Sequence, residues 1–188
     1  APVAIYQKME NAWAKPGAAG KVGLHCELRI VDNDDKDVEP GQSGEILIKG
    51  GNVLYEYWGN EEATKEALRD GWFYTGDIGY QDEDGDVWIH DRKKDMINSG
   101  SENIYPAEIE AFIHEMADIE DGVVVGKPDE KWGEVPVAVV MLKENATLTE
   151  SDFLGRFQDQ LARFKHPKAV YFVGELPRNA MGKVLKYE

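Results

Sequence analysis

The sequence predicts an α+β fold with two units, a β-rich one over residues 1–92 and a small α/β one over residues 93–188. Two observations support this prediction. In the first part, apolar and polar residues alternate with the period of two that half-buried strands show. After the charged cluster at residues 91–95, apolar residues recur at helical spacing, so the type of element changes there.

Short strands and turns dominate the elements expected in the first unit. Residues 1–20 are irregular, and the alternation over residues 24–30 then predicts a strand. A polar, turn-rich loop follows it up to Gly44. The remaining elements expected here are a strand at 45–49, a helix at 60–69, a strand at 71–74, and a hairpin whose acidic turn at 82–85 joins Tyr80 to residues 87–89.

The second unit is expected to contain two helices and three strands. Pro106 suits the first turn of a helix, and an apolar stripe follows it. That stripe consists of Ile109, Phe112, Ile113 and Met116. A capping-box-like start at residues 149–152 predicts the second helix. This helix is expected to bury Phe153, Leu154, Phe157 and Leu161, and the strands are expected at 123–125, 135–140 and 169–173.

Composition excludes several classes of protein. The net charge of −15, from 36 acidic and 21 basic residues, argues against a nucleic-acid partner, because phosphate backbones demand a basic face. No apolar run approaches the roughly 20 residues of a membrane helix, and the first residues do not resemble a secretion signal. Cys26 is the only cysteine, so no internal disulfide can form. We therefore expect a cytoplasmic protein with no transmembrane segment and no metal site of its own.

Four segments carry residues suited to nucleotide chemistry. They are residues 44–58, residues 74–77, residues 91–97 with 102–110, and residues 177–183. In this order and spacing they resemble the late motifs of the adenylate-forming enzymes, and of acyl-CoA synthetases among them. The resemblance covers nearly the whole chain from about Gly17. It implies that residues 1–92 are the β-rich end of a large adenylating domain and that residues 93–188 are the small C-terminal lid domain, without the larger part that holds most of the ATP and acyl site.

Two residues are candidates for nucleotide binding. A glycine such as Gly76 allows a tight turn, and the carboxylate of Asp77 can accept two hydrogen bonds from a vicinal diol. The resemblance implies that Asp77 binds the ribose hydroxyls of ATP and that the guanidinium of Arg92 contacts the nucleotide. It also implies that Lys94 is the hinge about which the second domain swings. Lys93 is interpreted as a solvated charge.

The resemblance assigns a further group to the pantetheine arm of CoA. The loop with Gly100, Ser101 and Glu102 would approach this arm, because the missing side chain of the glycine leaves a tunnel open. Many relatives have a second glycine where this chain has Ser101, so we expect a narrower passage. Trp132 and Phe164 match positions that line the CoA path in some ligases, and ordinary core or surface packing is the alternative interpretation of both.

Lysines near the end of the chain complete the candidate sites. The resemblance implies that Lys183 is catalytic, because an ammonium between the carboxylate and the α-phosphate neutralises the charge that crowds the reacting groups. Gly182 would give its loop the reach to enter the site. Lys165 and Lys168 could meet the phosphates of CoA, and exposed charges that serve only solubility are the alternative interpretation of both.

The function implied by this resemblance is that of an acid–thiol ligase. A carboxylic acid and ATP, with Mg²⁺ accompanying the ATP, would give acyl-AMP, and CoA would then take the acyl group. We expect the chain alone to be inactive, since the rest of the enzyme holds most of the site. A non-catalytic lid or partner module and an adenylation domain serving a carrier protein remain alternatives, although residues 103–106 favour CoA. The acid itself, whether fatty, aromatic or short, is left open.

Overall fold

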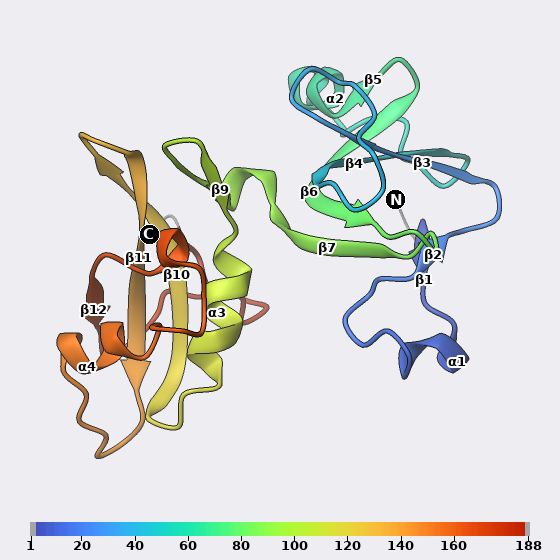
Figure 1. Ribbon diagram of the computed structural model, residues 1–188. Helices are drawn as coiled ribbons and strands as arrows, with labels where there is room; N and C mark the ends of the chain where they lie inside the picture. The colour runs from blue at the N-terminus through green and yellow to red at the C-terminus, as the bar shows by residue number, and fades with distance from the viewer. Residues whose placement is uncertain (1–2, 187–188) are drawn as a thin grey trace. The chain divides into compact units, whose positions relative to one another are not determined.

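The computed structural model describes residues 3–186, and the chain divides into two compact units, Ala1–Lys94 and Asp95–Glu188. Each unit has one five-stranded sheet and a few short helices, which confirms the α+β prediction (Figure 1). Within residues 3–186, every helix is too short or too polar to cross a membrane.

The sheet of the first unit is antiparallel throughout and follows the order β3-β4-β6-β5, with β7 paired to β6. Its strands are β3 (Cys26–Val31), β4 (Gly44–Gly50), β5 (Leu68–Arg69), β6 (Trp72–Gln81) and β7 (Val87–Arg92). The region expected to be irregular contains a short helix and most of a two-stranded sheet, formed by β1 (Ile5–Tyr6), α1 (Met9–Ala12) and β2 (Lys21–Val22). The β6–β7 hairpin confirms the turn expected at 82–85.

The predicted helix at 60–69 is shorter than expected. It is α2 (Glu61–Ala67), and the Oδ1 atom of Asn60 caps it by accepting a hydrogen bond from the Ala63 N–H at 3.0 Å. β6 differs more from its prediction, since it continues to Gln81 instead of ending at residue 74. Gly76 sits inside this strand at a φ of 70°, where the register with β4 shifts, so the expected turn is a bulge in a continuous strand.

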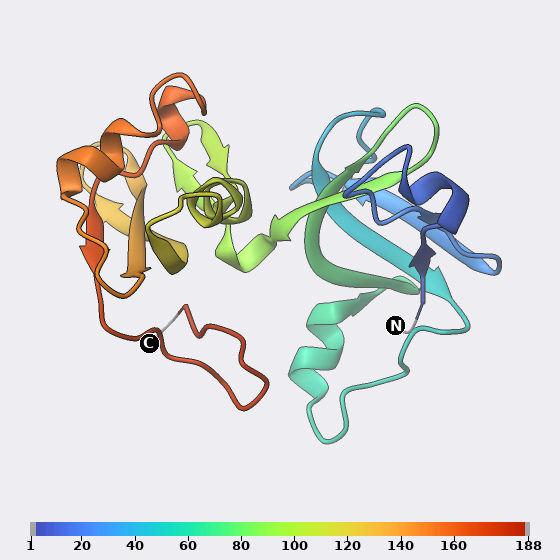
Figure 2. The same cartoon turned by 90° about the horizontal axis from the view of Figure 1, so that it is seen from below.

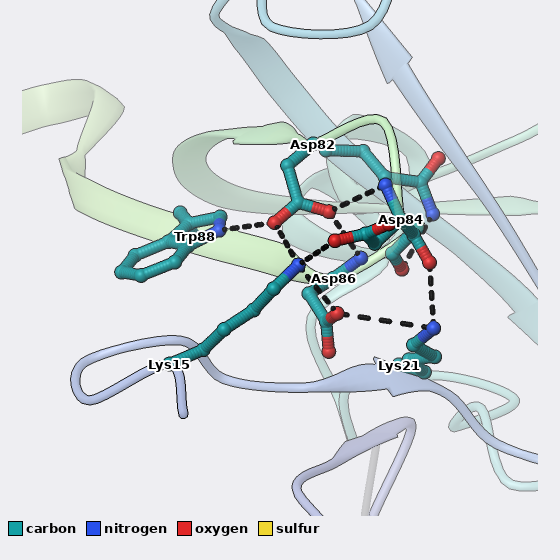
Figure 3. A network of polar contacts seen from close by, with 8 residues as sticks. Lys15, Lys21, Asp82, Asp84, Asp86 and Trp88 are labelled. Carbon is teal, nitrogen blue, oxygen red and sulfur yellow. Dashed lines mark hydrogen bonds and ion pairs between the residues drawn. The ribbon is translucent and has the colours of Figure 1, made fainter. Parts of the chain in front are cut away.

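An ion cluster joins the segment after α1 to the β6–β7 hairpin (Figure 3). The Nζ atom of Lys15 lies 2.6 Å from Asp82 Oδ2, 2.8 Å from Asp84 Oδ2 and 3.0 Å from Asp86 Oδ2. The Asp82 carboxylate also accepts a hydrogen bond from the Trp88 indole at 3.0 Å. Burial raises the pKa of Asp82, but the hydrogen bonds from Lys15 and Trp88 outweigh burial and lower that pKa below its usual range. The hydrogen bonds that the Lys15 ammonium donates to the carboxylates, above all to Asp82, raise the pKa of Lys15.

The sheet of the second unit follows the order β10-β11-β8-β9, with β12 parallel to β11. Its strands are β8 (Ile97–Ser99), β9 (Glu102–Ile104), β10 (Ile119–Asp129), β11 (Gly133–Leu142) and β12 (Val170–Phe172). β10 and β11 form one long hairpin, so the prediction of short strands at 123–125 and 135–140 was wrong in length. The last strand, expected at 169–173, is confirmed.

The predicted helix at Pro106 is confirmed as α3 (Pro106–His114), with the proline in its first turn, and it lies against β10 (Figure 2). The second predicted helix, α4 (Glu150–Gly155), starts as expected, because the Thr149 hydroxyl accepts from the Asp152 N–H. It ends earlier than predicted and does not reach Leu161. The chain turns after Gly155, and Asp159 has a φ of 63°, which a helix does not allow.

The core of the second unit contains the residues that the apolar stripes indicated. Phe153 and Phe157 are fully buried and meet edge to face, with ring centroids 5.3 Å apart. Two 3₁₀ turns, η1 (Lys93–Asp95) and η2 (Arg163–Lys165), complete the described elements. The remaining fully buried members of this core are Ile97, Ile104, Ile109, Ile113, Val124, Ala138 and Val140.

Candidate functional site

The two predicted nucleotide residues lie side by side on paired strands of the first unit. Asp77 in β6 is the register partner of Arg92 in β7. The Nε atom of Arg92 is 2.7 Å from Asp77 Oδ1, and their side chains are 52% and 29% exposed. A ligand carrying hydroxyls and negative charge could therefore contact both side chains from solvent.

The β6 bulge positions Asp77. The hydroxyl of Thr75 donates to the carbonyl of Ile46 at 2.7 Å and accepts a hydrogen bond from the Asp77 N–H at 3.0 Å. A Cβ on Gly76 would meet nothing within 4 Å, so its positive φ, rather than lack of room, is what favours glycine there. The bulge is thus held by local hydrogen bonds around Thr75, and Arg92 contacts the Asp77 carboxylate itself.

Glu45 in β4 is a residue of this site that the sequence analysis did not single out. It is only 8% exposed. One carboxylate oxygen accepts a hydrogen bond from the Gly76 N–H at 3.2 Å, and the other lies 2.8 Å from Lys93 Nζ. The interpretation of Lys93 as a merely solvated charge was therefore wrong. The sequence did contain a signal for Glu45: its charge stands next to the apolar run at residues 46–48, on a strand expected to be half buried.

An open groove lies beside the bulge. It is lined by residues of α2, by Tyr74, Thr75 and Gly76 of β6, and by residues 92–94. Lys94, the predicted hinge, is both on the wall of this groove and the last residue of the first compact unit.

In the second unit the structure brings two of the predicted CoA residues together. Gly100 and Ser101 form the turn of the β8–β9 hairpin. The strand pair next to this turn is Ser99 with Glu102, so the expected loop is a tight hairpin. The Gly100 N–H donates to the carbonyl of Trp132 at 2.7 Å. A Cβ on Gly100 would stand 3.1 Å from Cε3 of the Trp132 ring. The space left by the missing side chain therefore faces the indole.

The other predicted CoA residues lie outside this hairpin. Phe164 lies in η2, which contacts β9, and is 38% exposed, while Trp132 is 46% exposed. Lys165 does not point freely to solvent, since its Nζ atom is 2.7 Å from both carboxylate oxygens of Glu108. A phosphate at this place would have to compete with that carboxylate. Lys168 is exposed, and its backbone N–H donates to the carbonyl of Pro136.

Lys183, the predicted catalytic residue, is exposed on a loop that follows β12. Among the residues that the structure describes, no hydrogen bond or ion pair engages its ammonium group. Gly182 has a φ of 81° and thereby shapes the loop at this point. The cation is accordingly available for a ligand.

Comparison with known proteins identifies the family. Residues 1–58 match the family model described as AMP-binding enzyme, and residues 108–183 match that described as AMP-binding enzyme C-terminal domain. The chain belongs to the AMP-binding enzyme family. The resemblance drawn from the sequence motifs is thereby confirmed.

Curated members of the family are similar over almost the whole chain. Indoleacetate–CoA ligase of Aromatoleum aromaticum is 51% identical over 185 residues, which are 98% of this chain and 36% of the relative. The 2-succinylbenzoate–CoA ligase of Geobacillus kaustophilus is 47% identical over 179 residues, with 95% and 36% covered. The chain thus spans about 36% of the length of the curated relatives that it matches.

Solved structures agree with this placement. The o-succinylbenzoate CoA synthetase of Bacillus subtilis, in complex with its acyl-adenylate intermediate, aligns with a TM-score of 0.90 at 36% identity over 98% of this chain and 38% of that chain. ATP-bound MatB from Rhodopseudomonas palustris aligns with a TM-score of 0.83 at 42% identity over 92% of this chain and 35% of that chain.

Proposed function

We propose that this chain is the C-terminal part of an AMP-forming carboxylate–CoA ligase. The observation that carries the proposal is the Asp77–Arg92 pair, 2.7 Å apart at a hydrogen-bonded bulge, in a chain 51% identical to a CoA ligase. In the first half-reaction a carboxylate oxygen forms a bond to the α-phosphorus of ATP, and pyrophosphate leaves. Asp77 accepts hydrogen bonds from the ribose hydroxyls, and Arg92 contacts the nucleotide.

Lys183 serves this first half-reaction. Two anionic groups approach one another when the carboxylate meets the α-phosphate, and a cation placed between them stabilises the transition state more than the separated substrates. The exposure of Lys183 and its lack of a partner within the described residues support this role. Mg²⁺ enters as part of the ATP substrate.

The second half-reaction transfers the acyl group to CoA. The thiol sulfur forms a bond to the acyl carbonyl carbon, and AMP leaves. We place the pantetheine arm at the β8–β9 turn, where Gly100, Ser101 and Glu102 lie, with Trp132 and Phe164 beside its path. Lys94 is the hinge, in keeping with its place at the end of the first unit.

The acid is inferred only by class. The two curated relatives named above act on indoleacetate and 2-succinylbenzoate, which are both acids with an aromatic ring. We therefore propose that the substrate is an aromatic carboxylic acid. We also propose a cytoplasmic location, because Cys26 is a free thiol, as is usual in a reducing compartment.

The test uses the full-length protein that contains this chain. Aromatic, aliphatic and dicarboxylic acids are assayed for ATP–pyrophosphate exchange and for CoA-dependent AMP release. Lys183→Ala should lower exchange about a hundredfold and still permit thioester formation from preformed acyl-adenylate. The isolated chain should show no exchange. Unchanged exchange in Lys183→Ala, or activity of the isolated chain, would overturn the proposal.

A further inference from the structure

The loop that carries Lys183 is closed on itself. Arg178 and Val184 are bridged in antiparallel fashion, and the Leu185 N–H donates to the carbonyl of Pro177 at 2.8 Å. Figure 2 shows this stretch in deep red, leaving β12 and turning back on itself. Lys183 therefore lies in a closed loop, whereas the sequence suggested a loop to which Gly182 gives the reach to enter the site.

Side chains inside the loop fix the backbone of Lys183. The Oδ1 atom of Asn179 accepts hydrogen bonds from the Met181 N–H at 3.0 Å and from the Lys183 N–H at 2.9 Å. The Asn179 N–H donates to the carbonyl of Lys183 at 2.9 Å. The Nη1 atom of Arg178 donates to the carbonyl of Gly182 at 2.7 Å. The peptide groups on both sides of the lysine thus have partners, while its side chain stays exposed.

One end of the loop is attached to β10. The Nη2 atom of Arg178 pairs with Asp121 Oδ2. The other oxygen of this carboxylate accepts hydrogen bonds from His114 Nε2 at 3.0 Å and from the Gly122 N–H at 2.8 Å. Burial raises the pKa of Asp121, but these hydrogen bonds and Arg178 outweigh it and lower that pKa. The carboxylate is accordingly oriented from several sides.

The other end of the loop is attached to α3. The Nζ atom of Lys186 lies 2.7 Å from Glu110 Oε1, and the two side chains are only 17% and 15% exposed. The same oxygen of Glu110 accepts a hydrogen bond from the Val124 N–H of β10 at 2.7 Å. Two acids on rigid elements therefore hold the residues that flank the loop.

We propose that Asp121 and Glu110 are positioning residues, which clamp the Lys183 loop to α3 and β10 so that its ammonium moves with the second unit as one rigid body. This inference rests on the proposed function of Lys183. Well-oriented groups contribute strongly to rate, and a misplacement of 1 Å can cost about a hundredfold. A flexible tail would lose conformational entropy each time its lysine is placed in the site. A clamped loop is already ordered and avoids this cost.

The test removes each contact in the full-length protein. Asp121→Asn and Glu110→Gln keep the size of the side chain and remove its charge, and Arg178→Met breaks the first contact from the loop side. Each change should lower kcat of adenylation about tenfold, and the Asp121→Asn/Glu110→Gln pair about a hundredfold. The KM for ATP and thioester formation from preformed acyl-adenylate should stay unchanged. Amide hydrogen exchange of Met181 and Lys183 should accelerate.

A matched control is available in the same unit. The Asp118 carboxylate pairs with Arg156 at 2.6 Å, and within residues 3–186 no hydrogen bond or ion pair joins that carboxylate to the loop. Asp118→Asn should therefore leave adenylation unchanged. If Lys183→Ala lowers adenylation while the Asp121, Glu110 and Arg178 variants do not, the clamp is refuted and the proposed function stands. If Lys183→Ala has no effect, the proposed function fails first. Equal losses in both half-reactions would indicate general destabilisation and would also refute the clamp.

Discussion

The contact between Gly100 and Trp132 predicts how the second unit responds to one added methyl group. Gly100→Ala forces a side chain onto a residue with a φ of 67°, which costs about 1–2 kcal/mol relative to glycine. The new Cβ would also stand 3.1 Å from Cε3 of Trp132. Because this ring is half exposed, it can shift, so we add only about 1 kcal/mol for overpacking. The expected loss is about 2–3 kcal/mol.

Urea unfolding of the chain, followed by circular dichroism, measures this loss. With an m-value of about 1.5 kcal/mol/M, the midpoint should fall by about 1.3–2 M. Gly133→Ala is the control, since its φ is 78° but its Cβ would meet only Asn98 O, at 3.7 Å. That variant should lose about 1–2 kcal/mol.

Trp132→Ala in the Gly100→Ala background should remove the part of the loss that comes from the ring. Equal losses in Gly100→Ala and Gly133→Ala, with no coupling to Trp132, would refute the contact. In the full-length protein, Gly100→Ala should raise the KM for CoA and leave ATP–pyrophosphate exchange unchanged, because the turn is assigned to the second half-reaction.

Three further predictions concern other parts of the chain. The folded-state pKa of Asp82 is lowered, so the contribution of this carboxylate to stability is present above about pH 4 and is lost as the pH falls. Lys15→Met should therefore lower the melting temperature at pH 7 and make the melting temperature fall less steeply between about pH 5 and pH 2. The same slope of melting temperature against pH in both proteins would contradict this. Glu45→Ala removes a buried carboxylate with two partners, which should cost about 2 kcal/mol in urea unfolding and raise the KM for ATP, whereas an unchanged KM would exclude a role in the site. Phe157→Ala should cost about 3–5 kcal/mol, against less than about 1 kcal/mol for the half-exposed Phe164→Ala, and similar costs would show that Phe157 is not the centre of the core.

Local signals made much of the fold predictable. Pro106, the stripe behind it and the cap at Thr149 all act within a few residues, and the structure contains α3 and α4 where they indicated. Lengths were harder to predict. β10 and β11 extend well beyond their valine runs because each strand supplies the partner of the other. Such pairing depends on tertiary contacts, which a single segment does not record.

The same distinction holds for the candidate site. Asp77 and Arg92 stood out by residue type within motifs, and the sheet brings them together. Glu45 and Asp121 did not stand out, because their partners lie 48 and 57 residues away along the chain. Side-chain pairs of this kind leave no periodic pattern, so only the folded chain reveals them.

The acidic loop of the β6–β7 hairpin carries its own counter-ion. Carboxylates at alternate positions, as in Asp82, Asp84 and Asp86, are an arrangement that calcium loops also use. Here the positive charge is the ammonium of Lys15, which belongs to the same chain, so its concentration near the carboxylates does not depend on the ions in solution. Chelators and changes in the concentration of divalent ions should therefore leave the contacts between Lys15 and these carboxylates intact.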